Sequence, residues 1–307
     1  MTVRSLDFLD LPFLPRYRQD LLSLDSARLL TRGSPLGATA LFSYLNPRRN
    51  LYTALCAENG NSLMGQVALA EGETSARLVF LAPSLQVERF ALPLLDHLVK
   101  QAGGWGAQHI LAEIDEDSPA FPVLRQAGFA MYAWQRVWKL PRFTGETQEK
   151  TWRSAHPRDW PAVQSLHAQI VPALMHPVEK LPGQVSGLVC YHDTSLQAYA
   201  SCNNGIQGTW LQPLVLPDSP CFPGQILSLL QAAGVPGSRA VYVCVRSYQA
   251  WLASSLEELG AEAGPRQAVM VKRLTKLVQE LQPVSAMEKA MARVKPAAPA
   301  QHSDTDR

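Results

Sequence analysis

The feature that most constrains the fold is an apolar strand that ends at a proline and leads into an amphipathic helix. The first half of the chain has such a run over residues 77–82, before Pro83. The second half has one over residues 210–216, before Pro217, which follows Pro83 by 134 positions. After each proline the apolar residues recur at the spacing of one helix face. Two copies of a strand–turn–helix unit predict an α/β chain.

The elements on either side of this junction also follow one order in both halves. Each half is expected to begin with a short strand and a helical stretch, from Val3 in the first half and from Thr151 in the second. Two strands then precede the junction, and a strand, a short helix and a final strand follow it. The strands before the junctions are predicted at 52–57, 63–70, 187–191 and 196–202, and those after them at 109–114, 131–140, 240–245 and 267–274. Each half is therefore predicted as β-α-β-β-β-α-β-α-β, an α/β (α+β mixed) fold with a mostly antiparallel central sheet flanked by helices.

The length and the local composition predict how the chain divides into domains. A chain of 307 residues is long enough for two domains. We expect an N-terminal domain over residues 1–143, a polar linker over 144–150 and a C-terminal domain over 151–276. Residues 277–307 are rich in Ala, Pro and charge, and we expect a tail that is disordered towards its end.

Charge and residue types exclude several classes of function. A net charge of +2 gives no broad basic surface, and no apolar run is long enough for a membrane helix, so neither nucleic acid nor membrane is an expected partner. The seven histidines lack metal-ligand spacing, so no metal site is expected. The five cysteines form no C-x-x-C pair, which favours reduced thiols and a cytoplasmic location. No oligomeric state follows from these patterns.

With the strand–proline–helix junction at its centre, the element order resembles the GCN5-related N-acetyltransferase superfamily, as two tandem copies over residues 1–275. The superfamily has a Q/R-x-x-G-x-G/A signature after its fourth strand. In the first copy Gln86 and Ala91 fit this pattern, whereas Arg89 replaces the first glycine. In the second copy Pro220 stands where Gln or Arg belongs. The second copy is therefore expected to be degenerate and structural.

The resemblance implies acetyl-CoA as co-substrate. In the superfamily the fourth strand pairs with the pantetheine arm, and the following helix start binds the pyrophosphate, where free N–H groups and the helix dipole favour an anion. Asp117 aligns with an asparagine of the family. The cofactor-binding residues that the resemblance implies are Phe80, Leu81, Ala82, Gln86, Val87, Glu88, Arg89, Phe90, Ala91 and Asp117.

The catalytic residues are less well defined. Leu124 and Leu256 stand where many family members have a tyrosine that acts as general acid. Glu113 and Asp115, at the end of the fifth strand, are weak candidates for a base. The resemblance implies an acetyl-CoA-dependent N-acyltransferase in which a small-molecule or peptide amine attacks the thioester directly. The alternative is a non-catalytic binding or scaffold protein, which a closed gap between the fourth and fifth strands of both copies would favour.

Overall fold

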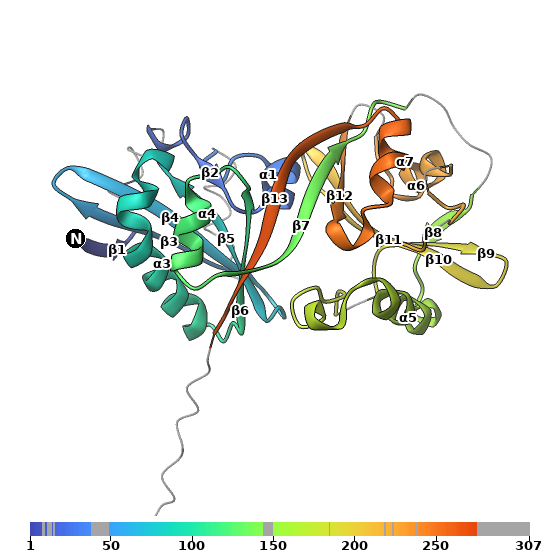
Figure 1. Ribbon diagram of the computed structural model, residues 1–307, viewed down its shortest axis with the longest axis horizontal. Helices are drawn as coiled ribbons and strands as arrows, with labels where there is room; N and C mark the ends of the chain where they lie inside the picture. Colours follow the sequence, from blue (N-terminus) through green and yellow to red (C-terminus); the bar gives the residue numbers. More distant parts are fainter. Residues whose placement is uncertain are drawn as a thin grey trace, which may run out of the picture. The chain divides into compact units, whose positions relative to one another are not determined.

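The computed structural model describes residues 1–7, 10, 14, 16–37, 49–143, 150–183, 185–217, 219–222, 224–236 and 239–274. Residues 144–149 of the predicted linker and the whole predicted tail, residues 277–307, lie outside these ranges. The first-half elements are β1 (Thr2–Ser5), β2 (Leu22–Ser23), α1 (Ser26–Arg32), β3 (Arg49–Glu58), β4 (Asn61–Ala70), β5 (Ser75–Ala82), α3 (Val87–Gly104), β6 (His109–Asp115), α4 (Ala120–Gln126) and β7 (Ala130–Lys139) (Figure 1). The second-half elements are β8 (Trp152–Ser154), α5 (Trp160–Ile170), β9 (Leu188–His192), β10 (Ser195–Asn204), β11 (Gly208–Val215), α6 (Ile226–Ala232), β12 (Ala240–Arg246), α7 (Leu252–Glu258) and β13 (Glu262–Arg273).

All these strands belong to one sheet, in the order β1-β3-β4-β5-β6-β13-β7-β12-β11-β10-β9-β8, with β2 paired to β5. The described pairings are antiparallel except for β5 with β6 and β11 with β12. The predicted fold class, a mostly antiparallel sheet flanked by helices, is confirmed. The element order is also confirmed, with β2 as an addition to the first half.

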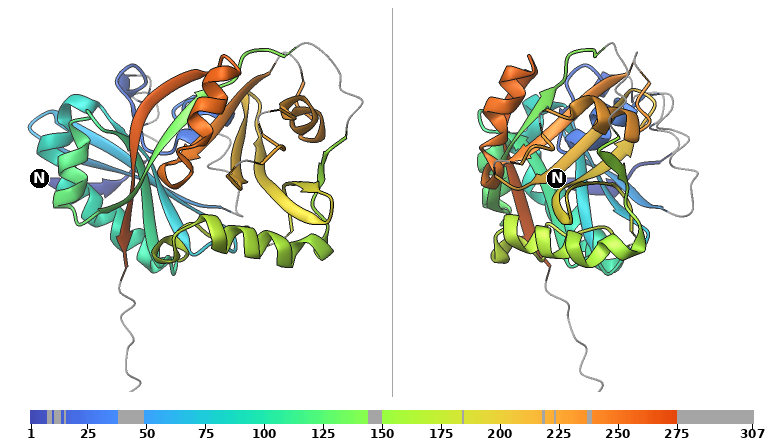
Figure 2. Two further views of the ribbon diagram at one scale, coloured as in Figure 1. Left: turned by 45° about the vertical axis from the view of Figure 1, so that its right-hand side comes forward. Right: turned by 90° about the vertical axis from the view of Figure 1, so that its right-hand side faces the viewer.

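The two halves exchange their last strands. β13, the end of the second half, lies between β6 and β7 of the first half, with Val269 opposite both Glu113 and Ala133. β7, the end of the first half, pairs in turn with β12. Figures 1 and 2 show β7 and β13 running side by side from one half into the other. Each half therefore completes its sheet with a strand of the other.

The helix after the first junction, α3, packs its apolar face on the first-half sheet. Leu94, Leu95 and Leu98 are fully buried in the core that α3 shares with β4, β5 and α4. Pro93 is predicted to delay the start of this helix or to distort it locally. The start is not delayed, because the helix begins at Val87 and continues through Pro93. Pro93 is the seventh helical residue, so it removes one intrahelical hydrogen bond, and the burial of the apolar face outweighs that loss.

A repeated ion pair supports the duplication, and the sequence analysis did not detect it. The Arg4 guanidinium donates to both carboxylate oxygens of Asp10, at 2.6 and 2.7 Å. The Arg153 guanidinium donates to both carboxylate oxygens of Asp159, at 2.7 and 2.8 Å. In each pair the aspartate also accepts the backbone N–H of the residue three positions before it. Both pairs follow the spacing R-S-x-x-x-x-D, in which the Arg-Ser ends the first strand of each half.

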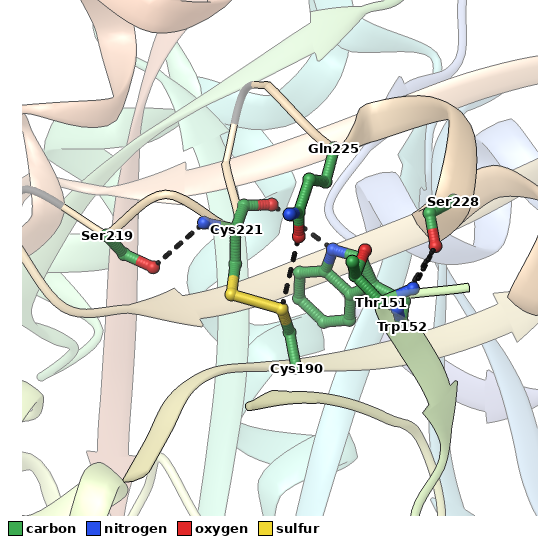
Figure 3. The surroundings of a disulfide bond; sticks show 7 residues. All are labelled: Thr151, Trp152, Cys190, Ser219, Cys221, Gln225 and Ser228. Carbon is green, nitrogen blue, oxygen red and sulfur yellow. Dashed lines mark hydrogen bonds between the residues drawn. A yellow bond between two sulfur atoms is a disulfide. The ribbon is translucent and has the colours of Figure 1, made fainter. Parts of the chain in front are cut away.

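The expectation that all cysteines are reduced is wrong for two of them. Cys190 and Cys221 form a disulfide with an S–S distance of 2.16 Å (Figure 3). Cys56, Cys202 and Cys244 are free. The spacing of cysteines in a sequence does not reveal a pair that the fold brings together, here across 31 positions. The compartment stays a prediction. Among the described residues, no helix is long and apolar enough to cross a membrane.

Candidate functional site

The first candidate site lies where β5 and β6 separate. The two strands pair in parallel only from Ser75 to Arg77 on β5. Beyond that point β5 pairs with β2 instead, with Ser23 opposite Phe80 and Leu22 opposite Leu81. The two strands are therefore splayed apart, as the resemblance implies for an active copy, but the open slot that it also implies is filled by the chain itself.

Leu24 closes the gap between the two strands. Its N–H donates to the carbonyl oxygen of Val79 on β5 at 2.9 Å, and its carbonyl oxygen accepts the N–H of Glu113 on β6 at 2.9 Å. The Leu24 side chain is 1% exposed and belongs to the first-half core. The splay is thus bridged by backbone hydrogen bonds and sealed by a core side chain.

Asp20 lies at the other end of the same segment, beside the turn that precedes α3. The N–H of Ser84 donates to the Asp20 carbonyl oxygen at 3.1 Å, and the Ser84 hydroxyl donates to the Asp20 carboxylate. The N–H of Leu85 points to the other carboxylate oxygen at 3.5 Å. A carboxylate therefore occupies the anion-favouring end of the 3-10 turn that leads into α3.

We call residues 20–24 the slot segment. It combines an extended backbone along Phe80 and Leu81 with an anion beside the turn at Ser84. The family resemblance predicts the same two features for the pantetheine arm and the pyrophosphate of acetyl-CoA. The slot segment thus takes the path that the resemblance assigns to the cofactor.

The predicted cofactor-binding residues lie around this segment. Phe80, Leu81 and Ala82 are buried on β5, and Gln86 is half-buried at the end of the turn. On α3, Val87, Phe90 and Ala91 are buried in the core, whereas Glu88 and Arg89 are exposed. Asp117 is exposed in the turn after β6.

Arg89, which replaces a glycine of the signature, is held at the surface by an acidic partner. Its Nη2 atom lies 3.0 Å from Oε2 of Glu58, the last residue of β3. The guanidinium therefore has a partner other than a phosphate.

Glu113, one of the two weak catalytic candidates, is buried in a polar network. Its carboxylate accepts the N–H of Ser26 at 3.0 Å and lies 3.4 Å from Nη1 of Arg77. Burial alone would raise the pKa of Glu113, but the charges of Arg77 and Arg246 outweigh it and lower that pKa. Glu113 therefore favours the ionised form that a base requires, but its oxygens are occupied by these partners.

Two glutamines from the exchanged strands connect the candidates. Gln267 on β13 donates to Asp115, the second candidate, at 2.9 Å, and accepts from Gln135 on β7 at 2.8 Å. It also accepts from the Ser26 hydroxyl at 3.1 Å. Neither glutamine could be recognised as a site residue from the sequence, because only the strand exchange brings them to β6. No local sequence pattern indicates that exchange.

A buried ion pair lies on the second-half side of this network. Arg246 on β12 is 4% exposed, and its Nε atom lies 2.9 Å from Glu179, which is 9% exposed. Arg246 also donates to Gln135, and Glu179 accepts the Tyr132 hydroxyl at 3.0 Å. Burial raises the pKa of Tyr132, so its hydroxyl stays protonated and serves as a donor. These contacts join the two halves through charged and polar side chains.

The corresponding gap in the second half is closed by a side chain. β11 and β12 pair in parallel from Gly208 to Leu211. Beyond that point the Gln249 amide accepts the N–H of Val215 at 2.9 Å and donates to the Pro213 carbonyl at 2.9 Å. Gln249 is 1% exposed. The edge of β11 that would face a pantetheine arm is therefore satisfied within the protein.

The turn after β11 is also tied down, as Figure 3 shows. The disulfide links Cys221 of this turn to Cys190 on β9, and the Trp152 indole donates to the Cys221 carbonyl at 3.1 Å. Asp218 and Pro223 of the same turn lie outside the described residues. These contacts agree with a degenerate, structural second copy.

Comparison with known proteins identifies the fold. No family model matches the chain, and neither does any curated protein. The chain is similar to a solved "Tandem GNAT protein from the clavulanic acid biosynthesis pathway (without AcCoA)", at 14% identity and a TM-score of 0.50, over 89% of this chain and 98% of that one. It is also similar to a GCN5-related N-acetyltransferase from Sphaerobacter thermophilus, at 16% identity and a TM-score of 0.50, over 89% and 95% of the two chains. The chain therefore has the tandem fold of the GCN5-related N-acetyltransferase superfamily.

Proposed function

We propose that this protein is an acetyl-CoA-dependent N-acyltransferase whose cofactor slot, in the first half, is closed by its own residues 20–24. The observation that carries the proposal is what fills the gap between β5 and β6. The extended backbone of the slot segment lies along β5, and the Asp20 carboxylate lies at its end. Pantetheine would supply a similar extended chain, and the pyrophosphate a similar anion. Acetyl-CoA would enter as the slot segment leaves.

The groups that the slot segment now uses fit this co-substrate. On β5, the backbone of Phe80, Leu81 and Ala82 would pair with pantetheine once the segment leaves. The N–H groups near Glu88 to Ala91 would hold the pyrophosphate, beside the Ser84 N–H that Asp20 now occupies, and Gln86 stands at the signature position. Acetyl-CoA would supply the acetyl thioester, which a small-molecule or peptide amine attacks directly, with no covalent enzyme intermediate.

The closed slot predicts weak binding by the unmodified protein. Displacing the segment exposes Leu24, at a cost of about 2 kcal/mol. Breaking its hydrogen bonds to β5, β6 and Asp20 costs about 1 kcal/mol for each bond that the cofactor does not replace. A total near 4 kcal/mol would weaken a micromolar affinity by about a thousandfold, to the millimolar range.

Calorimetric titration with acetyl-CoA and with CoA tests the proposal. We expect saturable binding in the millimolar range, and slow release of free CoA when a panel of amines is added. The matched control is Glu257→Gln, an exposed change on α7 outside the slot that removes one charge. Absence of binding by the folded protein and by variants with a weakened slot segment would overturn the proposal.

A non-catalytic binding protein is the second candidate. The gaps between the fourth and fifth strands of both halves are closed, and this is the feature that was expected for it. Gln249 and the disulfide of Cys221 close the second-half site, while Leu24 is part of the first-half core. Under this alternative the fold would serve as a frame for another ligand. The same titration separates the candidates, because this one predicts no acetyl-CoA binding even when the slot segment is weakened.

A further inference from the structure

A cavity of about 450 Å³ lies within residues 1–274, between elements of both halves. On the first-half side it is lined by α1 and by residues at the start of β5, among them Arg28, Arg32 and Arg77. On the second-half side it is lined by Lys180, in the segment after α5, and by Trp210 on β11. Its volume lies within the range of ordinary small-molecule pockets.

The charges that line this cavity are unbalanced. Among the described residues, three arginines and Lys180 line it, against two carboxylates, Asp25 and Glu73. Burial raises the pKa of Asp25, which disfavours its charged form. The nearly neutral chain thus concentrates cations in one concavity, where low-dielectric walls strengthen their attraction for an anion.

The packing around the cavity holds two of these cations in place. Lys180 donates from Nζ to the Thr74 hydroxyl at 2.7 Å, which ties the second-half segment to the start of β5. Arg77 lies 3.4 Å from Glu113, and its side chain is still 42% exposed. The Lys180 ammonium and the Arg77 guanidinium can therefore each donate to a further anionic partner and keep their present contacts.

Ser75 gives an independent sign of a missing partner. It lines the cavity, and its hydroxyl oxygen is buried with no hydrogen-bond partner among the residues that the structure describes. A buried hydroxyl without a partner is costly, and such groups usually face an ion, a water or a ligand. Apolar lining from Leu111 and the indole of Trp210 lies in the same cavity.

We propose that this cavity binds a small organic anion, a carboxylate or phosphate attached to an apolar or aromatic body. The anionic group would contact Lys180 and Arg77, with Arg28 and Arg32 adding positive charge around it, and accept a hydrogen bond from Ser75. The apolar body would pack against Trp210 and Leu111. If acetyl transfer is the activity, this is the cavity for the acceptor, because Asp25 follows directly on the slot segment. The inference itself does not require acetyl transfer.

Calorimetry with benzoate and with phenyl phosphate, without acetyl-CoA, tests the proposal and distinguishes the two anion chemistries. We expect submillimolar binding of at least one of them, and binding of uncharged benzamide that is at least about tenfold weaker. Arg32→Gln and Lys180→Gln should each weaken binding by about tenfold or more. The exposed Arg125 on α4 lies outside the cavity, so Arg125→Gln serves as the matched control and should change affinity less than about twofold.

Any of three results would overturn the proposal. The first is that neither anion binds saturably up to about 10 mM, and the second is that benzamide binds as tightly as the anions. The third is that Arg125→Gln loses as much affinity as Arg32→Gln and Lys180→Gln. Thermal unfolding of each variant shows that it is folded, so loss of affinity is not loss of structure. A failed acetyl-CoA titration leaves this test intact, because no step of it uses acetyl-CoA.

Discussion

Leu24→Ala should tighten acetyl-CoA binding while it destabilises the protein. Leu24 is 1% exposed, lies in the first-half core and bridges β5 to β6. In the open form that we propose for cofactor binding, this side chain would have left the core. The substitution would therefore act on the closed form alone.

The expected magnitude follows from the burial of Leu24. Replacing a fully buried leucine by alanine costs about 3 kcal/mol, within a range of 2–5. If that whole cost falls on the closed form, the open fraction rises by about a hundredfold, since 1.4 kcal/mol corresponds to a factor of ten. A millimolar dissociation constant would then fall to about 10 μM.

Two measurements and one control make this prediction specific. Urea unfolding gives the loss of stability, and calorimetry gives the affinity for acetyl-CoA. Leu63→Ala is the control, because Leu63 on β4 is fully buried in the same core but lies outside the slot. It should lose similar stability and keep the affinity of the unmodified protein. Asp20→Asn, a milder change in the slot segment, covers the case in which Leu24→Ala does not fold.

An unchanged affinity in both Leu24→Ala and Asp20→Asn would refute the reasoning. It would mean that residues 20–24 are not the barrier to binding. Equal gains in Leu24→Ala and Leu63→Ala would refute it as well, because general loosening of the core would then explain the effect.

Three further predictions concern what holds the fold together. Glu179→Gln leaves the buried charge of Arg246 without its counterion and should lower the free energy of unfolding in urea by about 3 kcal/mol; a loss below about 1 kcal/mol would contradict the buried pair. Arg153 lowers the pKa of Asp159, so the ionised carboxylate stabilises the fold; Asp159→Asn should cost about 2 kcal/mol at pH 7, and this difference should shrink as the pH falls below about 4. A difference that is constant from pH 7 to 3 would contradict this assignment. Cys221→Ser should cost about 3 kcal/mol, and alkylation of the unreduced, unfolded protein should label three of the five cysteines rather than all five.

Local patterns predicted the element order well, because strand and helix periodicity depends on neighbours in the sequence. The strand that ends at Pro83 and the apolar face of α3 are clear examples. The exchange of β7 and β13 could not be predicted in this way. Both strands have the same apolar pattern whichever sheet they join, and their partners lie more than a hundred residues away.

The candidate site was likewise predictable only where its residues form a local pattern in the sequence. The signature position Gln86 and the carboxylates of Glu113 and Asp115 were recognised in the sequence and lie near the splay. The occupant of the splay was not predicted, because Leu24 is one leucine among many in the sequence. Only the three-dimensional pairing with Val79 and Glu113 gives it a role.

The exchange of terminal strands has a consequence for synthesis on the ribosome. β6 reaches its neighbour β13 only after residues 262–273 have been made, so the first-half sheet stays incomplete until almost the whole described chain has left the ribosome. Contacts of such long sequence separation form slowly and leave strand edges open meanwhile. A fragment that ends near residue 143 would lack the strand that separates β6 from β7. The two halves thus repeat the same order of helices and strands, but each needs a strand of the other to complete its sheet.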